Sequence, residues 1–414
     1  MADDQPFEID LTDMANGGSA LGRNEDQVVF VPFAIPGERV RVQTVEQKRR
    51  VAWAQLIDVI EAAPERSEPA CAHFGPGLCA VCHWQHIDYA AQLRYKQAVV
   101  QDQLERIGKL KRPQVSPIVP APTPWGYRTS LTFELLRDGS YALPSNIPDR
   151  WMPIEMCPIL RPELLDLLAQ FDLNSDEVTR VKVMIGTDPD DRMLIIETVD
   201  DLAPEIEVDF PVSINLLLSD NEPVNLIGSP QVHYNILDRQ FRVTAGSFFR
   251  PNPALIGEMV KSILERLGLE GDETILDLYS GVGVFSAFLA EWCSLVISVE
   301  SYPPAVTDAD HNTADIDNID LLEGAVEVIA PDVEEDIDIV VVDPPGSGLS
   351  HEARDILGEI AAPLLIYISS DVASLARDIQ SLGGHGYRLV DVQPFDLLPQ
   401  SYHVECIAFL EYEG

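Results

Sequence analysis

Three acidic residues follow apolar runs in the second half of the chain, in a pattern typical of nucleotide-like cofactor sites. Asp277 opens the stretch D-L-Y-S-G-V-G-V-F, and two later runs, V-I-S-V-E and I-V-V-V-D-P-P, carry Glu300 and Asp343. Gly281 and Gly283 let the backbone approach a ligand where any Cβ would clash. Carboxylates at three strand ends are expected of an open parallel sheet whose ligand lies across those ends. The pattern therefore predicts a cofactor-binding site in which Glu300 binds a ribose diol. The alternative is a purely structural glycine turn in some other α/β domain.

The spacing of the cysteines predicts a second site. Cys71-x7-Cys79-x2-Cys82 forms a cluster, and Cys157 follows in the turn-like segment M-C-P-I-L. No secretory signal is visible, which argues against a disulfide scaffold, so the clustered thiols indicate a metal site. The spacing leaves Zn²⁺ and an iron–sulfur cluster both open, and simple packing without metal is a third possibility.

The net charge restricts the possible partners. Of 414 residues, 28 are Lys or Arg and 68 are Asp or Glu, which gives a formal charge of −40 and argues against a polyanionic partner. Residues 1–112 are nearly balanced, with 13 basic and 16 acidic residues, whereas residues 113–414 have 15 and 52. Only the N-terminal third is thus expected to face RNA. Its basic clusters, which can equally be solvated faces, are Lys48, Arg49 and Arg50, and then Arg106, Lys109, Lys111 and Arg112.

Two further expectations concern the environment of the protein. The acidic N-terminus contains no apolar signal segment, and no apolar run approaches the ~18 residues of a membrane span, so we expect a cytoplasmic protein without a membrane partner. Only six of the basic residues are Lys, and an acidic, Lys-poor surface suits a high-salt cytoplasm.

Hydrophobic patterning divides the chain into three blocks. Short alternating runs broken by Gly and Pro over residues 1–62 predict a closed barrel of about five strands. Residues 63–235 contain the cysteine cluster, a predicted helix over 88–108, and a Pro-rich stretch with strand-like runs. Residues 236–414 alternate strand and helix patterns and include a clear amphipathic helix over 253–269, so this block is the predicted cofactor domain.

Motifs along nearly the whole chain resemble the RNA (uracil-C5)-methyltransferases, which join an N-terminal TRAM barrel, an iron–sulfur loop and a class I S-adenosylmethionine domain. They are N-G-G-S-A-L-G-R and V-P-F-A-I-P-G-E-R-V in the barrel, C-x7-C-x2-C followed by Trp84-Gln85-His86, G-Y-R at Gly126–Arg128, C-P-I at Cys157, S-F-F-R-P-N at Ser247–Asn252 and H-V-E-C at His403–Cys406. The resemblance implies a multidomain α/β fold with an OB-like barrel, a central α+β domain and a Rossmann-like domain. It also implies an RNA partner, rRNA or tRNA, and we expect a monomer.

The resemblance further implies the residues of each site. A 4Fe–4S cluster, rather than Zn²⁺, would be held by Cys71, Cys79, Cys82 and Cys157. S-adenosylmethionine would be bound by Tyr279, Glu300 and Asp343, together with Arg250, Gly281 and Gly283. In the family's reaction a thiolate adds to uracil C6, the methyl group is transferred to C5, and a base removes the C5 proton. Glu405 matches that base.

The nucleophile position is where the chain departs most from the family. Ser370 stands where the cysteine is expected, and a hydroxyl is almost never ionised near neutral pH, so the same chemistry should be very slow. Cys406 and Cys293 are poor substitutes, because Cys406 alternates with Glu405 along a strand and Cys293 is expected in the core. Other departures are Asp371 for Asn, Val372 for Pro, Gly346 for Arg, Arg250 for Gln, Val284 for Asn and Ala325 for Asp.

Three functions therefore remain open. Whole-chain architecture favours a methyltransferase acting on uracil C5 of RNA. The substitutions around Ser370 favour a degenerate relative that binds RNA and the cofactor without turnover. The third is a methyltransferase with a different acceptor atom, since a D-P-P turn can also present carbonyls to an amino nitrogen. This third function is weakened by Gly346, because an aromatic residue would normally stand at that position and stack on the base.

Overall fold

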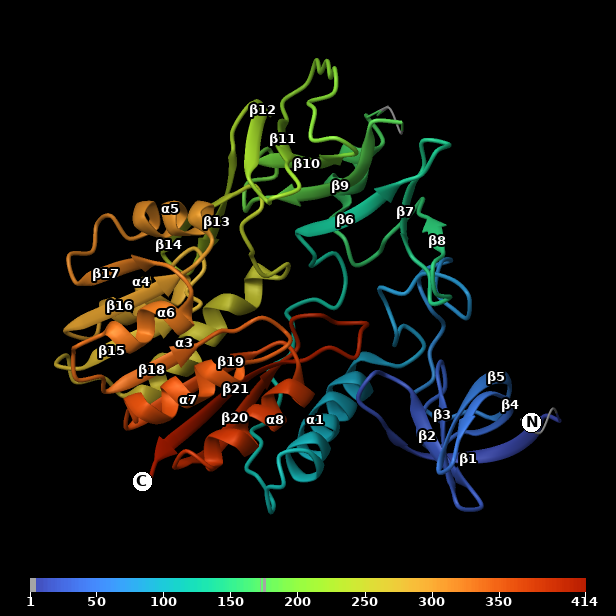
Figure 1. The fold of residues 1–414 in the computed structure, drawn as a ribbon. Helices are drawn as coiled ribbons and strands as arrows, with labels where there is room; N and C mark the ends of the chain where they lie inside the picture. The colour runs from blue at the N-terminus through green and yellow to red at the C-terminus, as the bar shows by residue number, and fades with distance from the viewer. Residues whose placement is uncertain (1–4, 172, 174–175) are drawn as a thin grey trace.

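The computed structural model describes residues 5–171, 173 and 176–414 of the chain. The chain forms three parts: a small barrel, a middle sheet and a larger α/β layer structure (Figure 1). The first four residues of the acidic N-terminal stretch lie outside the described residues.

The N-terminal part is a closed five-stranded barrel in the order β1-β2-β3-β5-β4. Alternating residues such as Ile9, Leu11, Val40 and Val42 fill its interior, which is the period-two pattern expected of strands with one buried face. The strands are β1 (Phe7–Met14), β2 (Ala20–Asn24), β3 (Gln27–Val31), β4 (Arg39–Lys48) and β5 (Val51–Glu61).

The middle part is a seven-stranded sheet in the order β12-β11-β10-β9-β6-β7-β8, with helix α2 (Pro162–Leu168) packed on one face. Its strands are β6 (Ser130–Leu135), β7 (Tyr141–Pro144), β8 (Trp151–Pro153), β9 (Val178–Ile185), β10 (Arg192–Thr198), β11 (Ser213–Leu217) and β12 (Pro223–Ile227). The cysteine loop lies between the barrel and this sheet, and α1 (Tyr89–Arg106) follows it, capped by the Asp88 carboxylate. A hairpin of β13 (Gln231–Ile236) and β14 (Arg239–Thr244) leads into the C-terminal part.

The C-terminal part is a seven-stranded sheet in the order β17-β16-β15-β18-β19-β21-β20. Strands β15 to β19 run parallel and β21 pairs antiparallel with β19, so strand order reverses between β15 and β18. The strands are β15 (Thr274–Leu278), β16 (Leu295–Glu300), β17 (Ile319–Glu323), β18 (Ile339–Val342), β19 (Leu364–Ser369), β20 (Tyr387–Phe395) and β21 (Glu405–Tyr412).

Helices cover both faces of this sheet. One face packs against α3 (Ile256–Leu267), which follows the short 3-10 turn η1 (Pro253–Leu255), and against α4 (Val284–Ala290) and α5 (Pro303–Asn312). The other face packs against α1, α6 (Val326–Ile329), α7 (His351–Ile360) and α8 (Val372–Gly383), with the 3-10 turn η2 (Ala330–Asp332) after α6. The near-continuous apolar strands, such as Ile339–Val342, follow from burial on both faces.

The predicted fold class is confirmed: a barrel, a central α+β part and a Rossmann-like α/β part. The amphipathic pattern over 253–269 appears as η1 and α3, which ends at the left-handed Gly268. Among the described residues, the helices are all too short or too polar to cross a membrane.

Candidate active site

The carboxyl end of β15 forms an open glycine turn at the point where strand order reverses. Tyr279 and Gly281 have left-handed φ angles of 61° and 58°, and a Cβ added at Gly281 would meet no atom within 4 Å. Gly283 differs, because a Cβ there would lie 3.2 Å from the Ala309 side chain on α5. Gly281 thus borders free space suited to a ligand, whereas Gly283 allows α4 and α5 to pack closely.

Glu300 is held against this turn by backbone donors. Its Oε2 accepts a hydrogen bond from the Gly281 amide at 2.9 Å, and its Oε1 accepts from the amides of Ser301 and Tyr302, each at 2.7 Å. A carboxylate has about four acceptor positions, so one remains on Oε2 beside the glycine turn. The fixed carboxylate is therefore oriented to accept one ligand hydroxyl.

Asp277 lies beneath the turn in a buried position. The Ser286 hydroxyl donates to its Oδ2 at 2.5 Å, while its Oδ1 is buried without a hydrogen-bond partner among the described residues. Burial, together with the nearby carboxylates of Asp343 and Glu300, raises the pKa of Asp277 to about 7.

Arg250 bridges two carboxylates at the same edge of the sheet. Its Nη1 and Nη2 donate to the two oxygens of Asp343 at 2.9 and 2.8 Å. Its Nε and Nη2 also donate to Oε1 of Glu405 at 3.0 and 2.7 Å. The side chains of Arg250, Asp343 and Glu405 are only 10%, 17% and 8% exposed. The two carboxylates raise the pKa of Arg250, whose charge is thus permanent, while burial raises the pKa of Glu405.

A cavity of about 340 Å³ lies beside this bridge and brings the predicted catalytic residues together. Ser370 and Glu405 both line it, and a Cβ added at Gly346 would lie 3.5 Å from the Ser370 hydroxyl oxygen. Asp371, also at the wall, caps α8 by accepting from the Ser374 amide at 2.7 Å. The remaining lining residues are Leu397, Leu398, His403 and Val404.

The two alternative thiols lie away from this cavity. Cys406 is fully buried in the apolar core on the other side of β21, and burial raises its pKa. Cys293 is buried in the opposite core layer. The position of Cys406 agrees with the alternation of residues along a strand, since its neighbour Glu405 lines the cavity.

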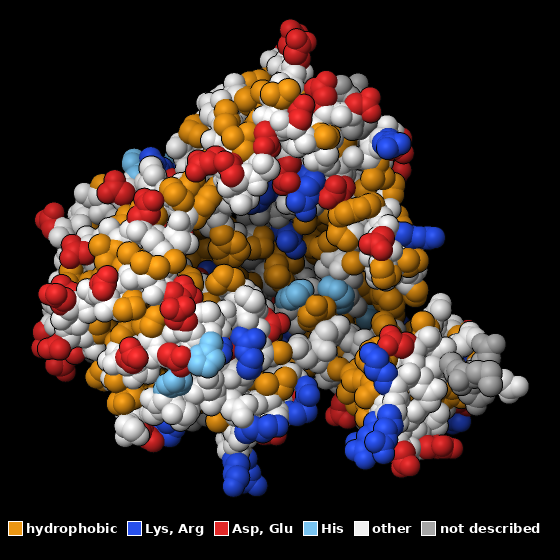
Figure 2. Space-filling view, viewed as in Figure 1, with side chains coloured by type: hydrophobic (Ala, Val, Ile, Leu, Met, Phe, Trp, Pro, Cys, Tyr) orange, Lys and Arg blue, Asp and Glu red, His pale blue; other side chains and the backbone are white. Residues whose placement is uncertain are grey.

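A second cavity of about 180 Å³ shares Leu398 and His403 with the first. His83 and Arg128 also line it, so it extends from the cysteine loop toward Ser370. Figure 2 shows the corresponding hollow in the middle of the molecule, with His side chains on its floor. Burial lowers the pKa of His83 to about 4, so this ring is neutral at neutral pH. Sequence reasoning missed His83, whose only signal is its place directly after Cys82.

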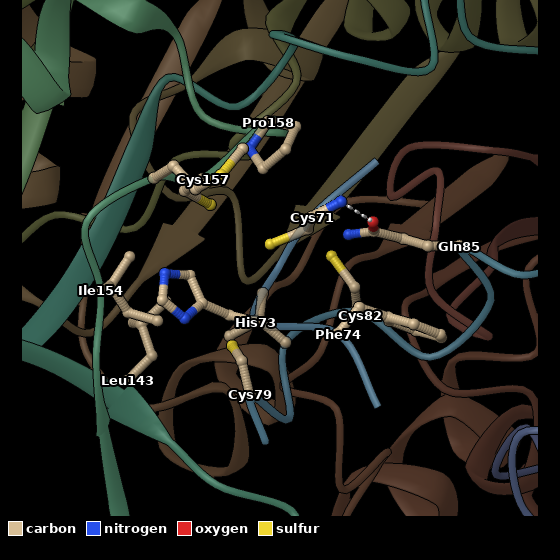
Figure 3. A pocket seen from close by; sticks show the side chains of 12 residues that line it. Cys71, His73, Phe74, Cys79, Cys82, Gln85, Leu143, Ile154, Cys157 and Pro158 are labelled. Atoms are coloured by element: carbon tan, nitrogen blue, oxygen red, sulfur yellow. Dashed lines mark hydrogen bonds between the residues drawn. The ribbon is translucent and has the colours of Figure 1, made fainter. Parts of the chain in front are cut away.

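The four predicted metal-binding cysteines line a single small pocket, whose volume is about 20 Å³ (Figure 3). All four are free thiols, and Cys71 comes from the same loop as Cys79 and Cys82, whereas Cys157 comes from the segment after β8. The Gln85 side-chain oxygen accepts from the Cys71 amide at 3.0 Å and fixes the loop. Burial raises the pKa of Cys79 to about 11 and that of Cys82 to about 12. Among the described residues, no three His, Cys, Asp or Glu side chains converge closely enough to ligate a single ion.

The predicted basic clusters lie on exposed segments. Lys48, at the end of β4, pairs with Glu46 at 3.0 Å and lies over the Trp53 ring. Arg106 pairs with Asp102 one turn earlier on α1. In Figure 2, blue side chains gather over the barrel and over the segment after α1, while red side chains cover the C-terminal part.

Comparison with known proteins gives consistent matches for both ends of the chain. A family model described as tRNA (uracil-5-)-methyltransferase matches residues 231–413, and a TRAM domain model matches residues 5–57. A protein of Streptomyces avermitilis described as an uncharacterized RNA methyltransferase is 32% identical over 98% of each chain. One from Halalkalibacterium halodurans, described in the same way, is 30% identical over 98% of this chain and 97% of its own.

A solved structure shows the same fold. The Pyrococcus abyssi tRNA (uracil-54, C5)-methyltransferase, in complex with S-adenosyl-L-homocysteine, is similar with a TM-score of 0.75 and 22% identity, over 98% of this chain and 100% of that one.

Proposed function

The chain belongs to the RNA (uracil-C5)-methyltransferase family, and from this membership we propose that it transfers the methyl group of S-adenosylmethionine to C5 of a uridine in rRNA or tRNA. The observation that carries this proposal is the single cavity lined by Ser370 and Glu405, with Arg250 joining Glu405 to Asp343 at the sheet edge. A donor at that edge and an acceptor in that cavity would be neighbours.

The donor site would lie over the glycine turn. Glu300 has one acceptor position free beside Gly281 and would take a ribose hydroxyl. Tyr279 and Asp343 flank the same strand ends, since the Asp343 amide donates to the Leu278 carbonyl at 3.2 Å. Bound there, S-adenosylmethionine would supply an electrophilic methyl group.

The acceptor chemistry would use the two residues of the cavity. The Ser370 hydroxyl gives its proton to water as its oxygen adds to uracil C6, and the electron pair of the C5–C6 bond moves to C5, which takes the methyl group. Glu405 then removes the C5 proton, the Ser370–C6 bond breaks to restore the uracil ring, and the released Ser370 oxygen takes a proton back from water. Because an alcohol is a much weaker nucleophile than a thiolate at neutral pH, this first step limits the rate.

We propose that the cysteine pocket holds an iron–sulfur cluster. Four free thiols line one space there, and in a 4Fe–4S cluster each of the four thiolates would bind a different iron atom. Cys157 would tie the loop that carries the other three to the middle sheet. We expect protein prepared without oxygen to contain iron and sulfide and to absorb visible light, and Cys157→Ser to lose both signals. Zinc without sulfide in the purified protein would contradict this assignment.

The TRAM barrel and the basic segments after it would hold the RNA. They belong to the part of the chain where basic and acidic residues are nearly balanced.

The proposal is tested by incubating the protein with S-adenosylmethionine labelled in its methyl group and with rRNA and tRNA fragments. Digestion of the RNA to nucleosides should give labelled 5-methyluridine slowly with the wild type and faster with Ser370→Cys. Ser369→Cys is a matched control, because Ser369 is buried in β19 and bonded to its own turn. Label on another nucleoside would refute the assignment to uracil C5.

A second function is binding of RNA and cofactor without turnover. It is favoured by the weakly nucleophilic hydroxyl at Ser370 and by Arg250, which forms hydrogen bonds to both Glu405 and Asp343. It predicts RNA binding by the wild type with no labelled nucleoside, even after prolonged incubation.

A further inference from the structure

Arg250 places a permanent positive charge where the proposed reaction needs a positively charged methyl donor. Its guanidinium lies 5.8 Å from the centre of the Phe285 ring, two residues after Gly283, and bonds to Asp343 at the end of β18. It therefore stands at the point of strand reversal, where open α/β sheets bind ligands.

The chemistry of transfer brings the donor close to this charge. A methyl group that moves directly to uracil C5 requires the sulfonium to lie next to the cavity of Ser370 and Glu405. Arg250 donates two hydrogen bonds to Glu405 itself. A sulfonium in a productive position is thus a near neighbour of the guanidinium, provided that the proposed function holds.

The local charge balance is what Arg250 changes. Asp343 and Glu405 both bond to its Nη2, so the two carboxylates lie next to each other, and both are mostly buried. Without Arg250 this pair would attract a cation. Two adjacent buried carboxylates repel each other, and a positive charge beside them would allow both to stay ionised. With Arg250 present, its guanidinium already compensates most of the negative charge of Asp343 and Glu405, so a cationic ligand is attracted less.

We propose that Arg250 takes the electrostatic place of a cationic ligand at Asp343 and Glu405, so that the crevice binds a neutral thioether nucleoside in preference to the corresponding sulfonium. In the proposed reaction this makes the protein favour the demethylated product over the methyl donor. Arg250 is then a specificity-determining residue rather than a direct cofactor ligand.

Calorimetric titration with three nucleosides tests this inference. S-adenosylhomocysteine is neutral at sulfur, S-adenosylmethionine carries the sulfonium charge, and sinefungin carries an amine charge at the same place. We expect the wild type to bind the thioether most tightly. Arg250→Gln should shift the affinity ratio toward both cationic ligands by about tenfold or more, as expected for loss of a neighbouring like charge.

Three further variants separate the effect of charge from the effect of structure. Arg250→Lys keeps the charge and should keep the wild-type ratio. Arg180→Gln is a matched control, because Arg180 also bridges two carboxylates, Glu134 and Glu197, but on the middle sheet. If Arg250→Gln does not fold, Asp343→Asn removes one carboxylate instead and should move the ratio further against the cationic ligands.

The outcomes distinguish this inference from the proposed function. Binding of all three ligands with an unchanged ratio in Arg250→Gln, or in Asp343→Asn where that is the variant that folds, would overturn the role of Arg250 and leave the donor site standing. Absence of binding to every folded variant would overturn the donor site, and this inference with it.

Discussion

At the scale of single residues, Asp277 lies buried beneath the glycine turn of the candidate site, and its raised pKa makes the stability of the protein depend on pH. Its carboxyl group keeps a proton up to about pH 7 in the folded protein, whereas an exposed Asp loses it near pH ~3.9. Between these values the folded state binds more protons than the unfolded state. The contribution of Asp277 to the free energy of unfolding therefore decreases as the pH rises from about 4 to 7.

We accordingly expect Asp277→Asn to become more stable relative to the wild type as the pH rises from 5 to 8, by about 2.5 kcal/mol. Denaturant unfolding at a series of pH values measures the difference. Ser286→Ala, which removes the hydroxyl that donates to this carboxylate, should raise the pKa further and steepen the wild-type trend. Parallel stability curves for Asp277→Asn and the wild type would show that Asp277 is ionised throughout.

At the scale of elements, the segment 396–404 connects β20 to β21 and contributes residues to both cavities. Helix α1 holds it through Lys96, which donates to Asp396 at 2.5 Å and to the Leu398 carbonyl at 3.0 Å. The cysteine loop holds it too, because the amides of His83 and Trp84 both donate to the Gln400 carbonyl. The cavity wall thus depends on two distant parts of the chain.

The Lys96–Asp396 pair is fully buried, so removing one partner leaves an uncompensated charge. We expect Lys96→Met to lower the free energy of unfolding by about 3–5 kcal/mol, and Lys96→Met with Asp396→Leu to recover most of the loss. Denaturant unfolding of both single variants and the double variant gives the coupling energy. Arg94→Met, on the exposed Arg94–Glu65 pair, is the control and should change stability by less than about 1 kcal/mol. A loss this small for Lys96→Met would contradict the proposed role of the pair.

Sequence patterns predicted the elements better than their contacts. Alternating apolar runs predicted the barrel. Apolar runs that end in carboxylates predicted the Rossmann-like sheet and the strand ends that carry Glu300 and Asp343. The Arg250 bridge was not predictable, since its partners lie 93 and 155 residues away and the family motif only marked Arg250 as a departure. The support of segment 396–404 by α1 was missed for the same reason, because Lys96 and Asp396 are 300 residues apart.

At the scale of the whole molecule, charge separates the N-terminal third of the chain from the rest. The two cavities are lined by the cysteine loop, by the segment before β6 and by the C-terminal part, and Figure 2 shows a hollow in the middle of the molecule. The formal charge of −40 arises almost entirely after residue 112. Mutual repulsion among these carboxylates disfavours the compact state at low ionic strength.

We therefore expect the unfolding temperature to rise as potassium chloride increases from about 0.1 to 1 M, because the screening length falls from about 10 to 3 Å. Differential scanning fluorimetry follows the change. A sucrose series at matched osmolality is the control that separates screening from exclusion of solutes from the protein surface. An unfolding temperature independent of salt would reject adaptation to a high-salt cytoplasm.

The most direct test of the account is covalent capture of RNA containing 5-fluorouridine, because fluorine at C5 prevents the final removal of a proton and leaves the nucleophile attached at C6. We expect Ser370→Cys to form an adduct stable in denaturing gels only when S-adenosylmethionine is present, and Ser370→Cys with Glu405→Gln to form it as well. The wild type should form it much more slowly. A folded Ser370→Cys variant that binds both the RNA and the donor yet forms no adduct would contradict the placement of Ser370 at the acceptor carbon.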